Sequence, residues 1–208
     1  MTALHFFLVH VWLCFLGLFL VLYVVLDGFD LGIGILSLFA RAEERRDIMV
    51  ASLGSTWDAN ESWLVVLGGA LFGAFPLAYA VVLNALYLPL VSMILALIFR
   101  AVAFEFRIHA RNKLGWSIAF GLGSLAAAVC QGFVLGGLIG GIAVTDRQFA
   151  GGAFDWLTPF SLASACGVVF GYVLLGAAYL ILKTDGAHQI RARRQAWIGF
   201  GLMMLAAA

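Results

Sequence analysis

Between His5 and Ala40 the chain carries only two charged side chains, Asp27 and Asp30. A helix needs about 20 mostly apolar residues to cross a bilayer, so this longer stretch must tilt or project beyond the hydrocarbon. Across the whole sequence 64% of residues are apolar and 11% are charged, whereas soluble domains are about half apolar and about a quarter charged. The sequence therefore predicts an all-α protein that is a polytopic bundle of transmembrane helices.

We expect five full spans and a truncated sixth. They are predicted at His5–Ala40, Trp63–Val82, Leu83–Phe104, Trp116–Val144 and Trp156–Lys183, with the sixth beginning near Ala196. The sixth stops at Ala208, too soon to cross a bilayer. We therefore expect residues 1–208 to be a single membrane domain and a fragment, holding the first helix bundle of a longer protein and the start of a second.

Charge placement predicts the orientation of the bundle. Eleven of the twelve Lys and Arg residues lie around three alternate loops, and only Arg147 falls elsewhere. Loops rich in Lys and Arg face the cytoplasm, so the N-terminus is predicted to lie outside, in the periplasm. The formal net charge of +1 gives no reason to expect nucleic-acid binding. Glycines repeat at four-residue spacing, as at Gly28 and Gly32, which favours close helix packing in lipid.

Asp27 and Asp30 are three residues apart and project from one helical face. One interpretation places them at the cytoplasmic interface, bonded to loop amides or to Arg41, Arg45 or Arg46. The other places them inside the membrane as a proton relay or a buried partner contact, because carboxylates near hydrocarbon usually have a function. The sequence leaves both interpretations open.

Asp58 and Glu61 also share a face, with Trp57 and Trp63 on either side. These residues fit an interfacial helix start in which Thr56 is the N-cap, the carboxylates complement the helix dipole and the indoles join an aromatic belt. They equally fit a proton entry, with Asp58 accepting protons from cytoplasmic water and passing them inward.

Arg100 follows an apolar run and is predicted to lie near hydrocarbon depth. It either snorkels outward or pairs with Glu105 or with one of the aspartates. The four histidines have no sequence spacing that stacks two imidazoles on one helical face. If haem chemistry occurs, we expect another subunit to supply the iron ligands. The four are His5, His10, His109 and His188.

Four blocks of sequence carry a family resemblance. They are DGFDLGIG at 27–34, WDANESWL at 57–64, GGALF at 68–72 leading to Pro76, and FRAVAFEFR at 99–107. In order and spacing they resemble subunit II of the cytochrome bd-type quinol oxidases, the cyanide-insensitive branch included. The resemblance covers about the first 110 residues, and residues 110–208 fit the family only as hydrophobic spans.

The resemblance implies a multi-pass subunit of a terminal oxidase in the bacterial inner membrane, which takes electrons from quinol and reduces oxygen to water. In that family subunit I carries haem b, haem d and the quinol oxidation site. This chain is then expected to hold no catalytic residue and no metal ligand, and to form a heterodimer with subunit I. A structural quinone, membrane lipid and a small accessory subunit are further expected partners.

By position, the resemblance makes Asp58 the proton-pathway aspartate, and we group Asp27, Asp30 and Glu61 with it. Trp63 resembles the tryptophan at the mouth of an oxygen channel. Trp57, Arg100 and Glu105 are expected to be structural or charge partners, and some relatives have Asp in place of Glu105.

Two other functions remain open at this point. A secondary transporter would use Asp27, Asp30 and Asp58 as its coupling site, although no inverted repeat is visible in the sequence. A purely structural assembly subunit would differ from the first hypothesis only in whether Asp58 moves protons.

Overall fold

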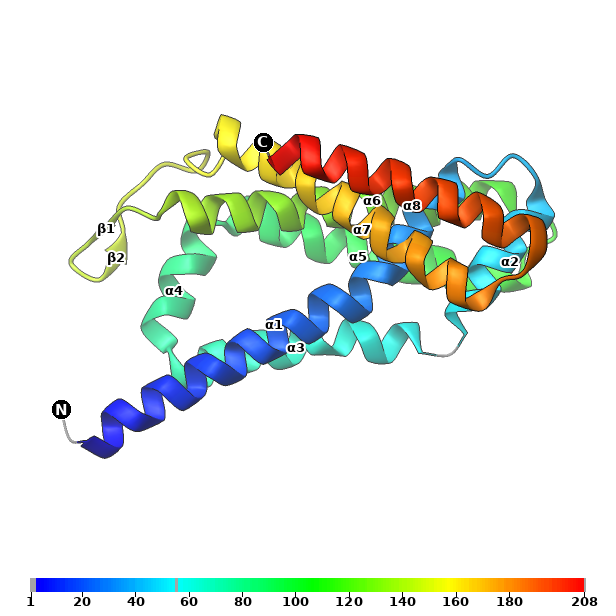
Figure 1. Cartoon of the computed structure of the whole chain (residues 1–208). Helices are drawn as coiled ribbons and strands as arrows, with labels where there is room; N and C mark the ends of the chain where they lie inside the picture. Colours follow the sequence, from blue (N-terminus) through cyan, green and yellow to red (C-terminus); the bar gives the residue numbers. More distant parts are fainter. Residues whose placement is uncertain (1–2, 55, 208) are drawn as a thin grey trace.

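A computed structural model describes residues 3–54 and 56–207 of the chain, and nearly all of them are helical (Figure 1). The helices are α1 (Ala3–Leu38), α2 (Glu43–Leu53), α3 (Trp57–Ala74), α4 (Pro76–Ala85), α5 (Tyr87–His109), α6 (Leu114–Gly140), α7 (Pro159–Lys183) and α8 (Gly186–Ala207). A short hairpin, β1 (Val144–Thr145) and β2 (Gln148–Phe149), follows α6 and pairs Val144 opposite Phe149. The predicted all-α fold is confirmed.

Four of the described helices are long and apolar enough to cross a membrane: α1, α5, α6 and α7. The boundaries of the second and third predicted spans were wrong. Residues 63–82 do not form one helix, because α3 ends at Ala74 and Pro76 opens α4. Proline has no N–H to donate to the preceding turn, so it starts a helix more readily than it continues one. Residues 83–85 then complete α4, and α5 begins at Tyr87.

The centre of the bundle is the crossing of α1 and α7, where the two backbones touch. A Cβ atom placed on Gly32 would lie 1.8 Å from the Tyr172 carbonyl oxygen, and one on Gly176 would lie 2.6 Å from the Gly32 carbonyl carbon. No side chain larger than hydrogen fits either position without moving a helix. The expectation that small residues bring helices close together is confirmed here.

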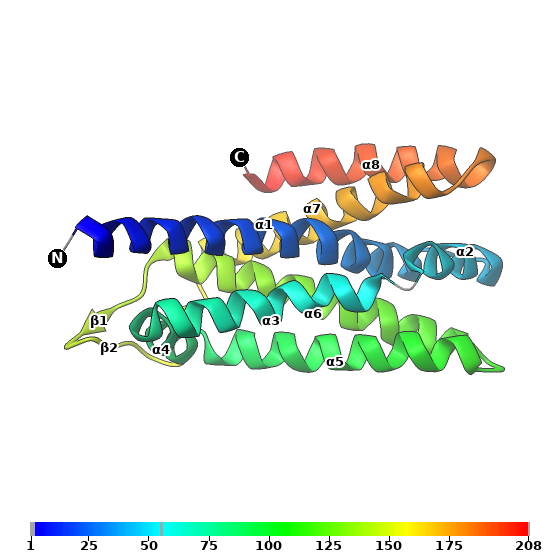
Figure 2. The ribbon, with the colours of Figure 1, turned by 90° about the horizontal axis from the view of Figure 1, so that it is seen from below.

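The N-terminal half of α1 extends away from this core (Figure 1). Helix α3 runs alongside α1, and α4 leads from the end of α3 back to α5 (Figures 1 and 2). Both α1 and α3 leave large apolar side chains uncovered, for example Phe7 at 61% exposure and Val65 at 75%. Patches of this kind on a membrane protein face lipid or a partner subunit.

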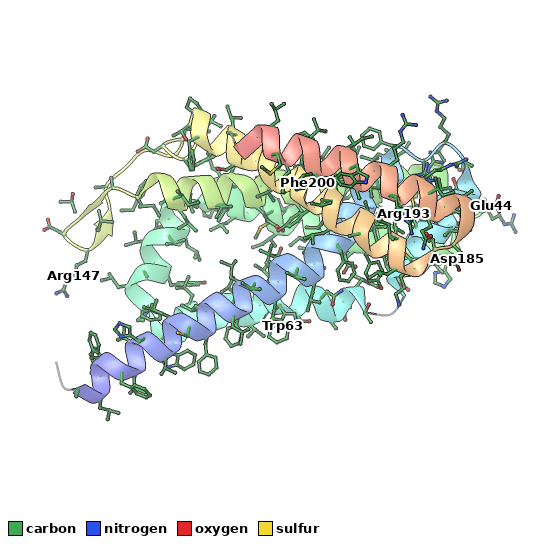
Figure 3. All side chains as sticks on the ribbon, viewed as in Figure 1. Glu44, Trp63, Arg147, Asp185, Arg193 and Phe200 are labelled. Carbon is green, nitrogen blue, oxygen red and sulfur yellow. The ribbon has the colours of Figure 1, made fainter. Side chains whose placement is uncertain are left out.

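Charged side chains are distributed unevenly between the two ends of the bundle. Glu44, Asp185 and Arg193 lie together at the end that holds α2, whereas Arg147 lies on the hairpin at the opposite end (Figure 3). The short helix α2 packs back against α1 and α7 at the first of these ends. Its buried residues Met49, Val50 and Leu53 join one hydrophobic cluster with residues of α1, α5 and α7.

Candidate functional site

An ion-paired cluster lies between α1, α3 and α5. Arg100 of α5 donates from Nη1 to Asp27 Oδ1 of α1 at 3.2 Å, and the same nitrogen lies 3.5 Å from Glu61 Oε2 of α3. The side chains of Arg100 and Asp27 are each 1% exposed, and that of Glu61 is 24% exposed. Arg100 pairs with an aspartate, which is one of the alternatives that the sequence left open. Snorkelling outward and pairing with Glu105 are wrong.

Asp30 lies one turn beyond Asp27 on the same face of α1 and is fully buried. Its Oδ2 accepts a 2.8 Å hydrogen bond from Nδ2 of Asn60 on α3. The interpretation that Asp27 and Asp30 bond to Arg41, Arg45 or Arg46 is therefore wrong, and both aspartates point into the bundle. Asn60 was part of a quoted motif but was not predicted as a site residue.

Four buried polar atoms of this cluster have no hydrogen-bond partner within the described residues. They are Asp27 Oδ2, Asp30 Oδ1, Arg100 Nε and Arg100 Nη2. Buried polar atoms are almost always paired in native proteins, and each exception usually reflects a water, an ion or a functional role. Two donors and two acceptors in one cluster are a set that ordered water can bridge.

A chain of hydrogen bonds joins α1, α6 and α7 close to Asp27 in the sequence of α1. Tyr172 of α7 donates to Gln131 Oε1 of α6, and Gln131 Nε2 donates to the Tyr23 hydroxyl of α1. Tyr23 lies four residues, or about one turn, before Asp27 on α1. Sequence analysis missed these three residues. The one available signal was Gln131, a polar side chain inside the fourth predicted span.

A second charged cluster joins α2 to α5 and α6 at the end of the bundle. Arg107 Nε donates to Ser117 Oγ at 2.8 Å, and Nη2 contacts Glu43 Oε1 at 2.7 Å and Asp47 Oδ1 at 2.9 Å. Lys113 Nζ adds a 3.0 Å contact to Asp47. Burial alone would raise the pKa of Asp47, but the hydrogen bonds from Lys113 and Arg107 outweigh it and lower the pKa. We call these residues the α2 clamp.

The other predicted residues lie outside both clusters. Asp58 is exposed on the first turn of α3, close enough for its charge to act on Glu61. Thr56 is the N-cap residue of α3, as expected, but its hydroxyl donates to the Leu53 carbonyl instead of capping the helix. Glu105 is exposed on α5.

The two tryptophans of the motif point in different directions. The Trp57 ring packs on Phe104 of α5 at 5.0 Å between centroids, and the Trp63 ring meets Phe19 of α1 at 6.0 Å. Figure 3 shows Trp63 partway along the bundle, where α3 and α1 run together. Trp57 therefore anchors α3 to α5, and Trp63 anchors it to α1.

His10 and His109 each interact through Nδ1 with a main-chain carbonyl one turn earlier in their own helices, and both are exposed. Within residues 3–54 and 56–207, no group of three or more His, Cys, Asp or Glu side chains is placed to hold a metal ion.

Comparison with known proteins shows which family this chain matches. Residues 8–208 match the family described as cytochrome bd terminal oxidase subunit II. The chain is 32% identical over 199 residues to cytochrome bd-I ubiquinol oxidase subunit 2 of Escherichia coli strain K12, covering 90% of this chain and 52% of that protein. It is 32% identical to cytochrome bd ubiquinol oxidase subunit 2 of Bacillus subtilis, covering 99% and 61%.

The structural comparison agrees with the sequence comparisons. The fold matches a chain of the bd oxidase from Geobacillus thermodenitrificans with a TM-score of 0.75 at 22% identity, covering 96% of this chain and 64% of that one. This chain spans about half the length of the Escherichia coli relative. With apolar spans, four motif blocks in order and a match over residues 8–208, it is an integral membrane protein of the cytochrome bd terminal oxidase subunit II family.

Proposed function

We propose that this chain acts as the subunit of a bd-type terminal oxidase that ligates no haem. The oxidase would be an oxidoreductase of the bacterial inner membrane that oxidises quinol and reduces oxygen to water. Family membership over residues 8–208 and the names of the ubiquinol oxidase relatives support this proposal. Haem b and haem d would lie in subunit I, as the family resemblance implies. The comparisons lend no support to the transporter hypothesis.

The exposed faces of α3 and of the N-terminal half of α1 are where we place subunit I. These faces carry apolar side chains that the rest of the chain does not cover, including Phe7, Val65 and Phe72. A heterodimer interface would remove them from lipid, and lipid, a structural quinone and a small accessory subunit could occupy other surfaces. We further propose that α3 and α4 together provide the fifth crossing, and that residues 1–208 belong to one membrane domain.

The charged end of the bundle that holds α2 would face the cytoplasm. The Lys and Arg residues at that end support this orientation, in which the N-terminus of α1 would lie outside (Figure 3). Asp58 opens α3 near the same end and is exposed, so it can take protons from cytoplasmic water. Glu61 lies one turn further along α3 and contacts Arg100, which in turn contacts Asp27. The site would thus pass protons from Asp58 toward the buried carboxyls Asp27 and Asp30.

The observation that carries this proposal is the cluster of three carboxyls around Arg100: the buried Asp27 and Asp30 and the partly exposed Glu61. Ionisable groups within a membrane bundle usually mark an ion or proton path. Co-expression with subunit I of a relative tests it. We expect a haem d absorbance band and quinol-dependent oxygen consumption only when both chains are present. A stable chain that yields neither signal with any subunit I would refute the proposal.

Replacing Asp58 with Asn separates proton delivery from assembly. If Asp58 delivers protons, Asp58→Asn should keep the haem spectrum and reduce turnover by about 10²-fold or more, the usual contribution of a positioned proton donor. Loss of the haem spectrum together with turnover would assign Asp58 to assembly instead.

A further inference from the structure

The two buried aspartates of α1 lie in different surroundings although they are three residues apart. Asp27 has an ionic partner, because Arg100 donates to its Oδ1 at 3.2 Å. Asp30 has only a neutral donor, the Asn60 amide at 2.8 Å. Both side chains are fully buried, so solvent does not reduce this difference.

The charges of the cluster do not balance. Three charged groups interact electrostatically with the Asp30 carboxyl: Arg100 from α5, Glu61 from α3 and Asp27 from its own helix. Three carboxyls thus surround one guanidinium, and Glu61 and Asp27 both share its Nη1. Uncompensated charge in a buried site is costly, so a proton on one carboxyl stabilises the set.

The partners of the Asp27 and Asp30 carboxyls indicate which of the two can accept that proton. A proton on Asp27 would weaken its ion pair with Arg100. Each aspartate leaves one oxygen unpaired, Asp27 its Oδ2 and Asp30 its Oδ1, so the two differ in the charge of the partner on the other oxygen. A proton added at Asp30 Oδ1 leaves the hydrogen bond from Asn60 in place and weakens no ion pair.

We propose that Asp27 is the fixed counter-ion of Arg100, whereas Asp30 is the carboxyl that exchanges the proton. Asn60 is its positioning residue and holds Oδ2, which leaves Oδ1 to take the proton. Proton transfer moves H⁺ onto Oδ1 and off again, with no change in the heavy-atom bonds. This proposal rests on the proposed function and assigns different roles to two aspartates that sequence analysis grouped together.

Matched variants of the full chain, assembled with subunit I, test this division. Asp30→Asn keeps a side chain of the same shape that can still pair with Asn60. We expect it to retain wild-type haem content and thermal stability, while turnover falls at least about tenfold. Asp27→Asn should instead lower thermal stability and haem content, because it leaves Arg100 without its closest partner.

A double variant and a spectroscopic measurement make the test independent of turnover. If Asp27 serves only to neutralise Arg100, then Asp27→Asn combined with Arg100→Gln should be more stable than Asp27→Asn alone. The pH-induced infrared difference spectrum should show a protonated-carboxyl band that Asp30→Asn abolishes and the double variant retains. The proposal is overturned if the band survives Asp30→Asn, or if the double variant shows no rescue. Absence of quinol oxidation in the wild-type complex would refute the proposed function alone, because the infrared and stability results would still decide this inference.

Discussion

Arg100 and Arg107 lie about two turns apart on α5 and are almost equally buried, at 1% and 2% exposure. Their surroundings differ. Arg107 uses Nε and Nη2 to bind Ser117, Glu43 and Asp47. Arg100 uses Nη1 for its two ion pairs and leaves Nε and Nη2 unpaired. A buried arginine with several partners holds the neighbouring helices together. A buried arginine with unpaired donors and more carboxyls around it than it can neutralise can still bind water, and one of those carboxyls can still take a proton.

Replacing Arg100 with Leu should have the largest effect on stability. The change leaves Asp27 buried without its cation, and breaking a buried ion pair costs about 3–5 kcal/mol. We expect loss of most folded chain from detergent extracts, measured by the recovery of monodisperse protein and by thermal unfolding. An Arg100→Leu chain as stable as wild type would show that Asp27 does not depend on Arg100.

Replacing Arg107 with Leu should have a smaller effect, although its contacts are shorter. Glu43 and Asp47 have side chains that are 39% and 43% exposed, so water can solvate them once Arg107 is gone. Loss of the α2 clamp should therefore cost about 1–3 kcal/mol. The measurement is the same thermal unfolding, and a loss equal to that of Arg100→Leu would remove the distinction between the two arginines.

The sequence predicts relations between residues that are close in the chain better than contacts between distant residues. The apolar run from His5 identified α1, and Asp27 and Asp30 were correctly placed on one face because helix periodicity fixes that relation. Pro76 was placed inside the single predicted span Trp63–Val82, although proline starts a helix more readily than it continues one, and the structure ends α3 before it. Both features are set by neighbouring residues.

For contacts between residues far apart in the chain, the sequence only reduced the number of possible partners. The charge of Arg100 required a partner, and the aspartates were among the options, but the choice of Asp27, 73 residues away, depends on how α1 and α5 rotate against each other. The Tyr23–Gln131–Tyr172 chain requires three helices in register, which no single periodicity encodes. Glycines at the α1–α7 crossing fix that register through backbone contact.

The α2 clamp should show a defined response to acid. Its contacts lower the pKa of Asp47 below the ordinary value of about 3.9. The stability that ionised Asp47 contributes is therefore fully present above about pH 4 and is lost as the pH falls through the lowered pKa. Thermal unfolding followed from neutral pH into acid should show a decline that Asp47→Asn reduces. An identical decline in both proteins would mean that Asp47 does not contribute.

Glu105 should be the least sensitive position of the comparison. It lies on α5 between the two arginines in sequence, but it is exposed and belongs to neither cluster. Glu105→Gln should change thermal stability by less than about 0.5 kcal/mol, as exposed substitutions usually do. A larger loss would place Glu105 in a subunit contact rather than at a lipid or solvent surface.

The most direct test of the central claim is turnover per haem in complexes with subunit I that carry Arg100→Lys or Arg107→Lys. Lysine keeps the positive charge but lacks the planar set of guanidinium donors. The claim predicts that Arg107→Lys leaves turnover per haem unchanged, because the α2 clamp only stabilises the fold. Arg100→Lys should lower turnover about tenfold or more while haem remains bound. Equal turnover in the two complexes would contradict the claim that the underpaired arginine, and not the fully paired one, serves the proton path.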